Sequence, residues 1–234
     1  MTLQKLYSYV RRAMDDYSMV DDGDKIAVGV SGGKDSLALL YALSGLRKFY
    51  PKKFDIVALT VNLGFENQDF NLIKDFCKDL DVECKIIDTE IGDIVFHKRK
   101  ESNPCSLCAK MRKGSLNDVA KKMGCNKVAY AHHRDDMIET MLMSLIYEGR
   151  FHCFNPVTYL DRMGLNVIRP MMYVPEMDVI GFANKYNLPV AKNPCPLDGH
   201  TKREYIKTLV RQLNRENPNC KDRLFTAVLN GGFD

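Results

Sequence analysis

Residues 25–36 of this chain read KIAVGVSGGKDS, and they decide the fold. The apolar run from Lys25 to Val30 is typical of a buried strand, and Gly32 and Gly33 follow it almost at once. Glycines at such a position let the backbone adopt positive φ and approach an anion closely. The helix expected after them would direct free N–H groups at the same point. The stretch therefore predicts a strand, a phosphate-binding turn and a helix in direct succession.

Strands and helices alternate along most of the remaining chain. Apolar runs predict strands at 54–62, 83–88, 127–131 and 165–169. Apolar residues at helical spacing predict helices at 35–46, 69–80, 105–123, 135–147 and 176–186. This alternation is typical of βαβ units, so we expect a Rossmann-like α/β fold, a parallel twisted sheet with helices on both faces. Ligands of such sheets bind at the carboxyl ends of the strands, where the Gly-rich turn also lies.

Pattern and charge divide the chain into three segments. Residues 1–22 carry an amphipathic helix, residues 23–195 carry the strands and motifs, and residues 196–234 form a basic helical extension. No run of about 18 apolar residues appears. The charged residues of the first helix interrupt any apolar stretch of the kind that a signal peptide needs. We therefore expect a cytoplasmic protein with no membrane partner.

Basic residues gather in two zones, although the formal net charge is only +4. Between His97 and Lys113 there are six lysines and arginines against one acidic residue, and between residues 200 and 234 there are seven against four. Such zones are typical of proteins that bind a polyanion such as RNA. Solvated surface charge is the alternative interpretation of the same pattern.

The chain contains eight cysteines, many for its length. A secreted disulfide framework fits poorly, because a chain of this length can fold on its core. Cys105 and Cys108 form a CxxC pair at the start of an expected helix, where thiol pKa values are lowered. Cys195 lies far downstream in the sequence NPCP. Clustered cysteines in a reducing compartment indicate a metal site or sulfur chemistry, and a zinc pair or a redox dithiol are the simpler alternatives.

Residues 131–136, AHHRDD, follow the fourth predicted strand and open a helix. This element should therefore lie at the same sheet edge as the Gly-rich turn. Asp135 and Asp136 fall in the first helical turn, where negative charge is stabilised and Mg²⁺ could be recruited. Taken by itself, an acidic first turn indicates helix capping.

Three of these motifs together resemble a known family. Residues 31–36, SGGKDS, are similar to the PP-loop signature of ATP pyrophosphatases, which cleave ATP to AMP and pyrophosphate. Residues 131–136 resemble an element shared by PP-loop enzymes that modify tRNA. Residues 104–114, PCSLCAKMRKG, resemble the tRNA-cytidine 2-sulfurtransferase family. The likeness runs from about Lys25 to Cys195.

The resemblance implies the residues of a site. The expected ATP-binding residues are Val30, Ser31, Gly32, Gly33, Lys34, Asp35, Ser36, Thr60 and Arg169. The expected catalytic residues are Lys34, Asp35, Asp135 and Asp136, with Mg²⁺ held through the phosphates and by the aspartates. In the family, three cysteines matching Cys105, Cys108 and Cys195 hold a [4Fe–4S] cluster and leave one iron without a protein ligand.

Two positions in the second half of the chain leave alternatives open. Arg169 could contact ATP phosphate or the substrate backbone, or form a structural ion pair with Glu176. The family often carries a second CxxC near Cys195, but here its second cysteine position is Asp198. We expect Asp198 to be a loop residue, with a weak fourth ligand of the cluster as the alternative.

The expected reaction has two steps. ATP adenylates a carbonyl oxygen of a pyrimidine in tRNA, with C2 of cytidine favoured, and a sulfur nucleophile then displaces AMP. The implied partners are tRNA, a sulfur donor such as a cysteine desulfurase or free sulfide, and a possible second copy of the chain. One alternative is a PP-loop ligase that uses an amine nucleophile, as lysidine synthases do, with structural zinc on the cysteines. Another is a nucleotide-binding, metal-sensing module without catalysis.

Overall fold

A computed structural model describes residues 1–65, 69–99, 104–191, 195 and 201–231. Their strands form one six-stranded sheet in the order β3-β2-β1-β4-β6-β5. The strands are β1 (Asp24–Gly29), β2 (Phe54–Asn62), β3 (Glu83–Asp88), β4 (Lys127–Ala129), β5 (Val157–Leu160) and β6 (Leu165–Ile168). All neighbouring pairs are parallel except β5 with β6. The strand order changes direction between β1 and β4, which is where sheets of this kind bind ligands.

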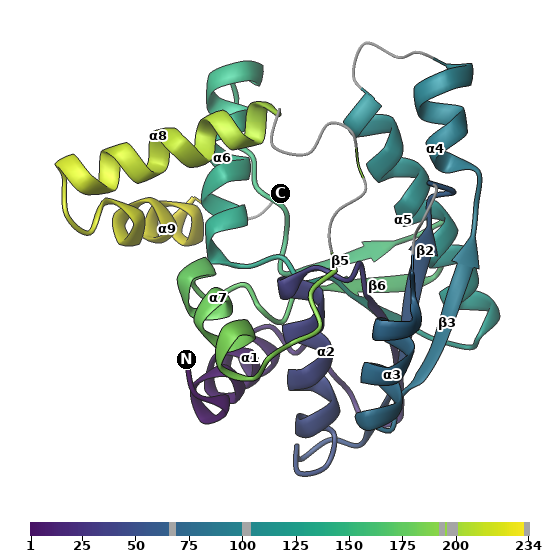
Figure 1. Ribbon diagram of the computed structural model, residues 1–234. Coiled ribbons are helices and arrows are strands. Elements are labelled where there is room, and N and C mark those ends of the chain that lie inside the picture. The colour runs from purple at the N-terminus through teal and green to yellow at the C-terminus, as the bar shows by residue number, and fades with distance from the viewer. Residues whose placement is uncertain (66–68, 100–103, 192–194, 196–200, 232–234) are drawn as a thin grey trace.

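Helices cover both faces of the sheet (Figure 1). They are α1 (Leu3–Asp16), α2 (Lys34–Leu46), α3 (Asn71–Asp79), α4 (Ile91–Asp93) with a π-helical turn (Ile94–Lys98), α5 (Pro104–Lys122), α6 (Arg134–Glu148), α7 (Glu176–Lys185), α8 (Lys202–Glu216) and α9 (Cys220–Asn230). The predicted fold class, a parallel twisted sheet with helices on both faces, is confirmed. None of the described helices is long and apolar enough to span a lipid bilayer.

Two elements were not predicted from the sequence. The edge strand β5 pairs antiparallel with β6 through a turn at Gly164, whose φ is +63°. Its four residues are only half-buried or exposed, so they show no apolar run. The second element is the helical stretch of α4 and the following π-turn, which lies between the predicted strand at 83–88 and the predicted helix at 105–123. Its apolar residues Ile91 and Val95 are buried in a small cluster beside α5.

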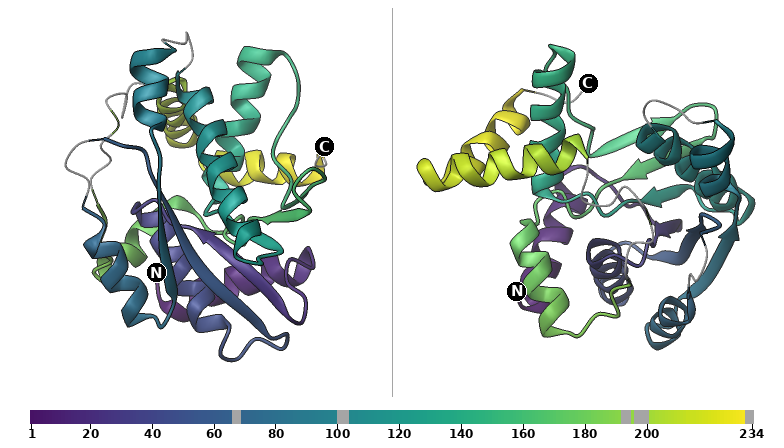
Figure 2. Two further views of the ribbon diagram at one scale, coloured as in Figure 1. Left: turned by 90° about the vertical axis from the view of Figure 1, so that its right-hand side faces the viewer. Right: turned by 45° about the horizontal axis from the view of Figure 1, so that its top comes forward.

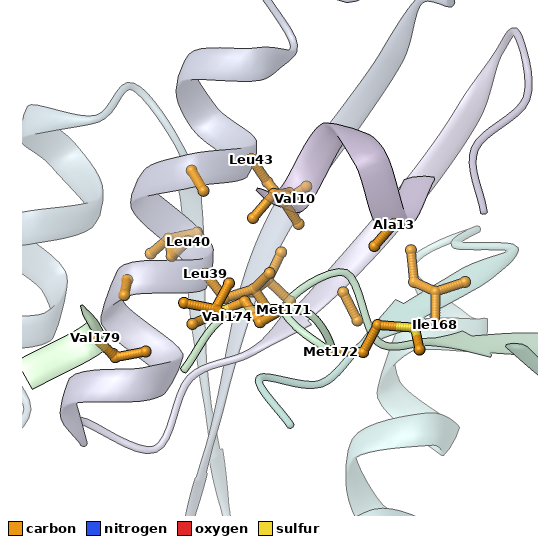
Figure 3. Packing of buried hydrophobic residues seen from close by; sticks show 14 of the residues in the cluster. Val10, Ala13, Leu39, Leu40, Leu43, Ile168, Met171, Met172, Val174 and Val179 are labelled. Atoms are coloured by element: carbon orange, nitrogen blue, oxygen red, sulfur yellow. The ribbon is translucent and has the colours of Figure 1, made fainter. Parts of the chain in front are cut away.

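The main core holds the Gly-rich loop in place by fixing the helix that follows it. Leu39, Leu40 and Leu43 of α2 are fully buried, and Figure 3 shows them packed against Val10 of α1 and the segment after β6. The buried face of α1 repeats at helical spacing, with Leu6, Val10, Ala13 and Met14 pointing inward.

The two C-terminal helices pack on α6, on the far side of it from α4 and α5 (Figures 1 and 2). Ile206 and Val210 of α8, and Phe225 and Val228 of α9, are buried in the same hydrophobic cluster as α2. This burial fixes the position of the polar face of α8 relative to the start of α6.

Candidate active site

The Gly-rich loop joins β1 to α2 and is held by its own serines. The amide of Ser31 donates to Oγ of Ser36 over 3.1 Å, and that hydroxyl donates to the carbonyl of Gly33 over 2.9 Å. Gly32 has φ of +81°, and a Cβ there would lie 3.3 Å from side-chain atoms of Ala191 and Ile73. Only glycine suits this position, so the loop keeps its amides and the start of α2 directed to one point.

A pocket of about 480 Å³ opens in front of this loop. Its walls are the ends of β1, β2 and β4 with their following residues, together with one face of α5. The lining residues include Val30, Ser31, Gly33, Asp35, Ser36, Thr60, Ala109, Arg112, Lys113, Tyr130, His132 and Asp136. The pocket therefore lies where the strand order reverses, at the place that the sequence predicted for the ligand.

Thr60 lies in the wall of the pocket at the end of β2. Its side chain is buried, and within the described part of the chain its Oγ1 has no hydrogen-bond partner. Buried polar atoms in folded proteins are nearly always paired, so an orphaned hydroxyl in a pocket wall fits a site that a polar ligand completes.

Asp136 has two roles at the start of α6. Its carboxylate accepts a hydrogen bond from the His133 amide over 2.9 Å, while its own amide donates to Nδ1 of His133 over 3.2 Å, which together form a capping box. The same side chain lines the pocket. The capping interpretation and the ligand interpretation of this residue are therefore compatible.

Asp135 points from α6 toward α7 and α9. Its carboxylate accepts hydrogen bonds from the Glu176 amide over 2.7 Å and from Nζ of Lys221 over 2.6 Å. Burial opposes ionisation of this carboxyl, but the Lys221 and Glu176 hydrogen bonds outweigh burial and lower its pKa. Asp135 is therefore a buried, ionised carboxylate.

The loop lysine belongs to a charged network. Nζ of Lys34 lies 3.0 Å from the Asp35 carboxylate and 3.3 Å from Oε1 of Glu176. The same Glu176 oxygen accepts a hydrogen bond from Nζ of Lys207 over 2.7 Å. Arg203 of α8 pairs with Asp136 over 3.2 Å. It also pairs with Glu139 over 3.1 Å.

The opposite wall of the pocket carries positive charge that has no acidic partner in the described part of the chain. Arg112 and Lys113 of α5 line the pocket, and neither forms an ion pair there. Burial lowers the pKa of Lys113, and repulsion from Arg169, Arg203 and Arg112 lowers it further. By contrast, Lys98 from the same basic zone is paired with Asp93 over 2.7 Å.

Cys105 and Cys108 lie in the first two turns of α5, on the helix that also forms the positive wall. Burial raises the pKa of Cys108; Arg112 opposes this rise, and Cys195 and Cys105 are close enough to add to it. Cys108 is thus within electrostatic range of the other two thiols. Across the residues that the structure describes, no three His, Cys, Asp or Glu side chains are arranged as a set of metal ligands. Asp198 lies outside the described residues.

Arg169 contacts the pocket through another residue. Its guanidinium donates to Nδ1 of His132 over 3.3 Å, to Oγ1 of Thr158 over 3.1 Å and to the carbonyl of Asn155. His132 lines the pocket, whereas Arg169 is buried behind it. The ion pair considered between Arg169 and Glu176 is not among the described contacts, because Glu176 pairs with Lys34 and Lys207.

Several charged residues of this site were given no role from the sequence. His133 and Glu139 belong to the motif that begins at Ala131, whereas no motif contains the other three, Arg203, Lys207 and Lys221. The last three belong to the C-terminal basic zone, for which binding of a polyanion and solvated surface charge were the two interpretations. Their excess positive charge was the available signal, but it gave no information about the carboxylates that they face.

A Rossmann-like sheet with a Ser-Gly-Gly-Lys-Asp-Ser loop at its switch point is the architecture of PP-loop proteins. The family model of the PP-loop domain matches residues 4–213. The tRNA-cytidine(32) 2-sulfurtransferase of Geobacter sulfurreducens is 37% identical to this chain, covering 97% of it and 90% of the relative. The chain belongs to the tRNA-cytidine(32) 2-sulfurtransferase family of PP-loop proteins.

Solved structures agree with this assignment. The U34-tRNA thiolase NcsA from Methanococcus maripaludis, solved with its [4Fe–4S] cluster, superposes with a TM-score of 0.80 at 25% identity. The match covers 97% of this chain and 77% of that one. The NH₃-dependent NAD synthetase of Campylobacter jejuni matches with a TM-score of 0.52 at 20% identity, over 98% of this chain and 93% of that chain. The second likeness concerns the fold alone.

Proposed function

We propose that this chain is an ATP-dependent tRNA sulfurtransferase that replaces the C2 oxygen of a cytidine, at tRNA position 32, with sulfur. The names of its relatives support the reaction and the position. The observation that carries the proposal is the double use of α5. One end of this helix holds Cys105 and Cys108, and its next turns supply Arg112 and Lys113 to the pocket in front of the Gly-rich loop.

In the first step the base oxygen attacks the α-phosphorus of ATP, and pyrophosphate leaves. The amides of the loop at the start of α2 and the Lys34 ammonium would stabilise the phosphate charge. The unpaired hydroxyl of Thr60 would donate a hydrogen bond to the nucleoside of ATP or accept one from it. Asp35 and Asp136 also line the pocket and would contribute carboxylate oxygens to Mg²⁺, the ligand type that this ion prefers.

In the second step a sulfur nucleophile adds to C2 of the activated base, and AMP departs with the oxygen. Arg112 and Lys113 would hold the departing phosphate and the backbone of the RNA, because their positive charge has no acidic partner in the described part of the chain.

The cysteine set fits an iron–sulfur cluster by its chemistry. Cys105, Cys108 and Cys195 are three thiols, of which Cys108 lies within electrostatic range of the other two, and thiolates are the usual ligands of such clusters. A [4Fe–4S] cluster held by three cysteines would supply an iron that can bind the sulfur to be transferred. A cysteine desulfurase or free sulfide as the sulfur source, and a homodimer as the working form, are parts of the same proposal.

The first experiment is to purify the protein without oxygen and measure its iron, zinc and acid-labile sulfide. About four irons and four sulfides per chain are expected, together with ATP-dependent formation of 2-thiocytidine in tRNA. Cys105→Ala and Cys195→Ala should lose the visible chromophore and the thiolation. Cys220→Ala is the matched control, because this half-buried thiol on α9 belongs to neither motif. Full thiolation by the Cys105 or Cys195 variant, or a colourless zinc protein, would contradict the proposal.

A further inference from the structure

The C-terminal helices meet the nucleotide site through three basic side chains. Arg203 and Lys207 lie one turn apart on α8, and Lys221 lies on α9. Residues Ile206, Val210, Phe225 and Val228 anchor both helices in the main core, so the three cations have fixed positions beside α6 and α7.

These cations balance most of the acidic charge around the Gly-rich loop. Five carboxylates gather there: Asp35, Asp135, Asp136, Glu139 and Glu176. Among the described residues, their lysine and arginine partners are Lys34 from α2 and three residues of the C-terminal helices, Arg203, Lys207 and Lys221. Without α8 and α9 the region would carry a strong negative charge and would repel a nucleotide.

Lys207 differs from the other two cations because it shares its partner with the loop lysine. Oε1 of Glu176 receives Nζ of Lys207 at 2.7 Å and Nζ of Lys34 at 3.3 Å. One carboxylate oxygen thus holds two ammonium groups side by side. Burial alone would lower the pKa of Lys207, but its hydrogen bond to Glu176 and the nearby carboxylates outweigh burial and raise this pKa, so the side chain stays charged.

Lys207 also retains unused hydrogen-bonding capacity. An ammonium group has three donors, and Lys207 uses one of them in the side-chain contacts of the described residues. Asp136, which lines the pocket, lies close enough for its charge to act on Lys207. Glu176 therefore places the Lys207 ammonium next to the lysine of the Gly-rich loop.

We infer that Lys207 is a second phosphate-binding lysine of the ATP site, held beside Lys34 by Glu176 to bind the terminal phosphates of ATP. The inference rests on the proposed function, because it assumes that ATP lies on the Gly-rich loop. It makes the C-terminal helix pair a part of the nucleotide site, where the sequence had suggested only a basic extension.

The test is to compare Lys207→Met with the wild type in the binding of a non-hydrolysable ATP analogue and of AMP, by titration calorimetry. A charge-assisted hydrogen bond to phosphate predicts a loss of about tenfold to a hundredfold for the ATP analogue and about twofold or less for AMP. Lys207→Arg should restore most of the affinity. Arg211→Met is the matched control, because Arg211 is exposed one turn further along α8 and should leave both affinities unchanged.

Lys207→Met should fold, because Glu176 keeps its contact with Lys34, and the unfolding temperature of each variant checks this. Unchanged affinity of Lys207→Met for the ATP analogue would overturn the inference. An equal loss of affinity for the ATP analogue and AMP would also overturn it, since that result indicates a structural role. If the wild type binds neither nucleotide, the proposed ATP-dependent function fails and the inference fails with it.

Discussion

The two walls of the pocket use charge in opposite ways. On the wall beside the Gly-rich loop, Asp35 and Asp136 line the pocket and Asp135, Glu139 and Glu176 lie outside its lining. Each of these five carboxylates has a cationic partner within hydrogen-bonding distance, and most of these partners come from α8 and α9. On the α5 wall, Arg112 and Lys113 face the pocket with no acidic partner in the described part of the chain. The charges of the first wall are paired, as buried charges in a stable protein usually are. The unpaired cations of the second wall are typical of a surface that binds an anionic ligand.

Because of this difference, substitutions on the two walls should affect different properties of the protein. Removing one member of a buried ion pair leaves the other charge unpaired, which is costly for folding. Removing a cation that has no partner leaves nothing unpaired and reduces the repulsion among its neighbours. Substitutions on the first wall should therefore lower the free energy of unfolding, and substitutions on the second should mainly lower activity.

The largest effect is expected for Lys221→Met on the paired wall. It leaves the Asp135 carboxylate, with 7% of its side chain exposed, without its lysine. The free energy of unfolding should fall by about 3 kcal/mol, measured by urea denaturation. Adding Asp135→Asn should recover most of the loss, because asparagine is neutral and leaves no unpaired charge buried. A double variant as unstable as Lys221→Met alone would show that packing, and not charge, sets the cost.

The double variant Arg112→Ala, Lys113→Ala tests the unpaired wall. The rate of AMP formation with tRNA should fall about a hundredfold in kcat/KM, because two cations that face the phosphates are lost. The unfolding free energy should change by less than about 0.5 kcal/mol, since the two substitutions leave no acidic group without an ion-pair partner. Lys110→Ala is the control, as Lys110 is exposed on the same helix outside the pocket. Loss of stability without loss of activity would reverse the comparison.

Gly32→Ala tests the loop that lies between the two walls. Alanine at φ of +81° is strained, and this costs about 1–2 kcal/mol, which should lower the unfolding temperature by roughly 2–8 °C. Binding of the ATP analogue should weaken as the loop shifts away from Ala191 and Ile73. Gly33→Ala is the matched control, because Gly33 has φ of −77° and an added Cβ would meet only Ser31 Oγ at 3.4 Å.

The smallest effect is a pH dependence at His132. Burial lowers the pKa of His132 from 6.5 to about 3, so the folded ring stays neutral while the unfolded ring takes up a proton below about pH 6.5. Its contribution to stability is therefore present above pH 6.5 and is lost as the pH falls toward 3.

A non-titrating replacement isolates this contribution. Between about pH 7.5 and about pH 5.8 the wild type should lose about 1 kcal/mol more unfolding free energy than His132→Asn, whose amide oxygen can still accept from Arg169. Urea denaturation at both pH values measures the difference. Equal losses in the two proteins would show that His132 is not held neutral.

The fold was largely predictable because its signals are local. Buried parallel strands such as β1 and β2 read as apolar runs, and the helices between them show apolar residues at helical spacing. The edge strand β5 was not predictable in this way, since its residues are not fully buried and its pairing with β6 is decided by the turn at Gly164. The helical stretch from Ile91 to Lys98 was missed because its few apolar residues are buried only against α5.

In the candidate site, too, the residues of local motifs were predictable, whereas a position set by tertiary contacts was not. Loop residues such as Ser31 and Ser36, and Asp136 at the start of α6, lie around one pocket as the motifs predicted, because parallel strands bring their carboxyl ends to one edge. Arg169 was expected among the ATP-binding residues, but it is held behind His132. The sequence around Arg169 does not indicate whether its guanidinium points into the pocket or toward hydrogen-bond acceptors behind it.

The sequence by itself determined the Gly-rich loop, the acidic start of α6, the cysteine pair and the sheet that brings the first two together. These follow from residue types at short spacing, since glycine conformations, helix starts and strand periodicity are local properties. Only the tertiary structure decided which charges are paired. The partners of Asp135 and Glu176 are Lys221 and Lys207, which lie 86 and 31 residues away along the chain. They meet because hydrophobic burial fixes α8 and α9 on α6, and that packing depends on surfaces assembled from the whole chain.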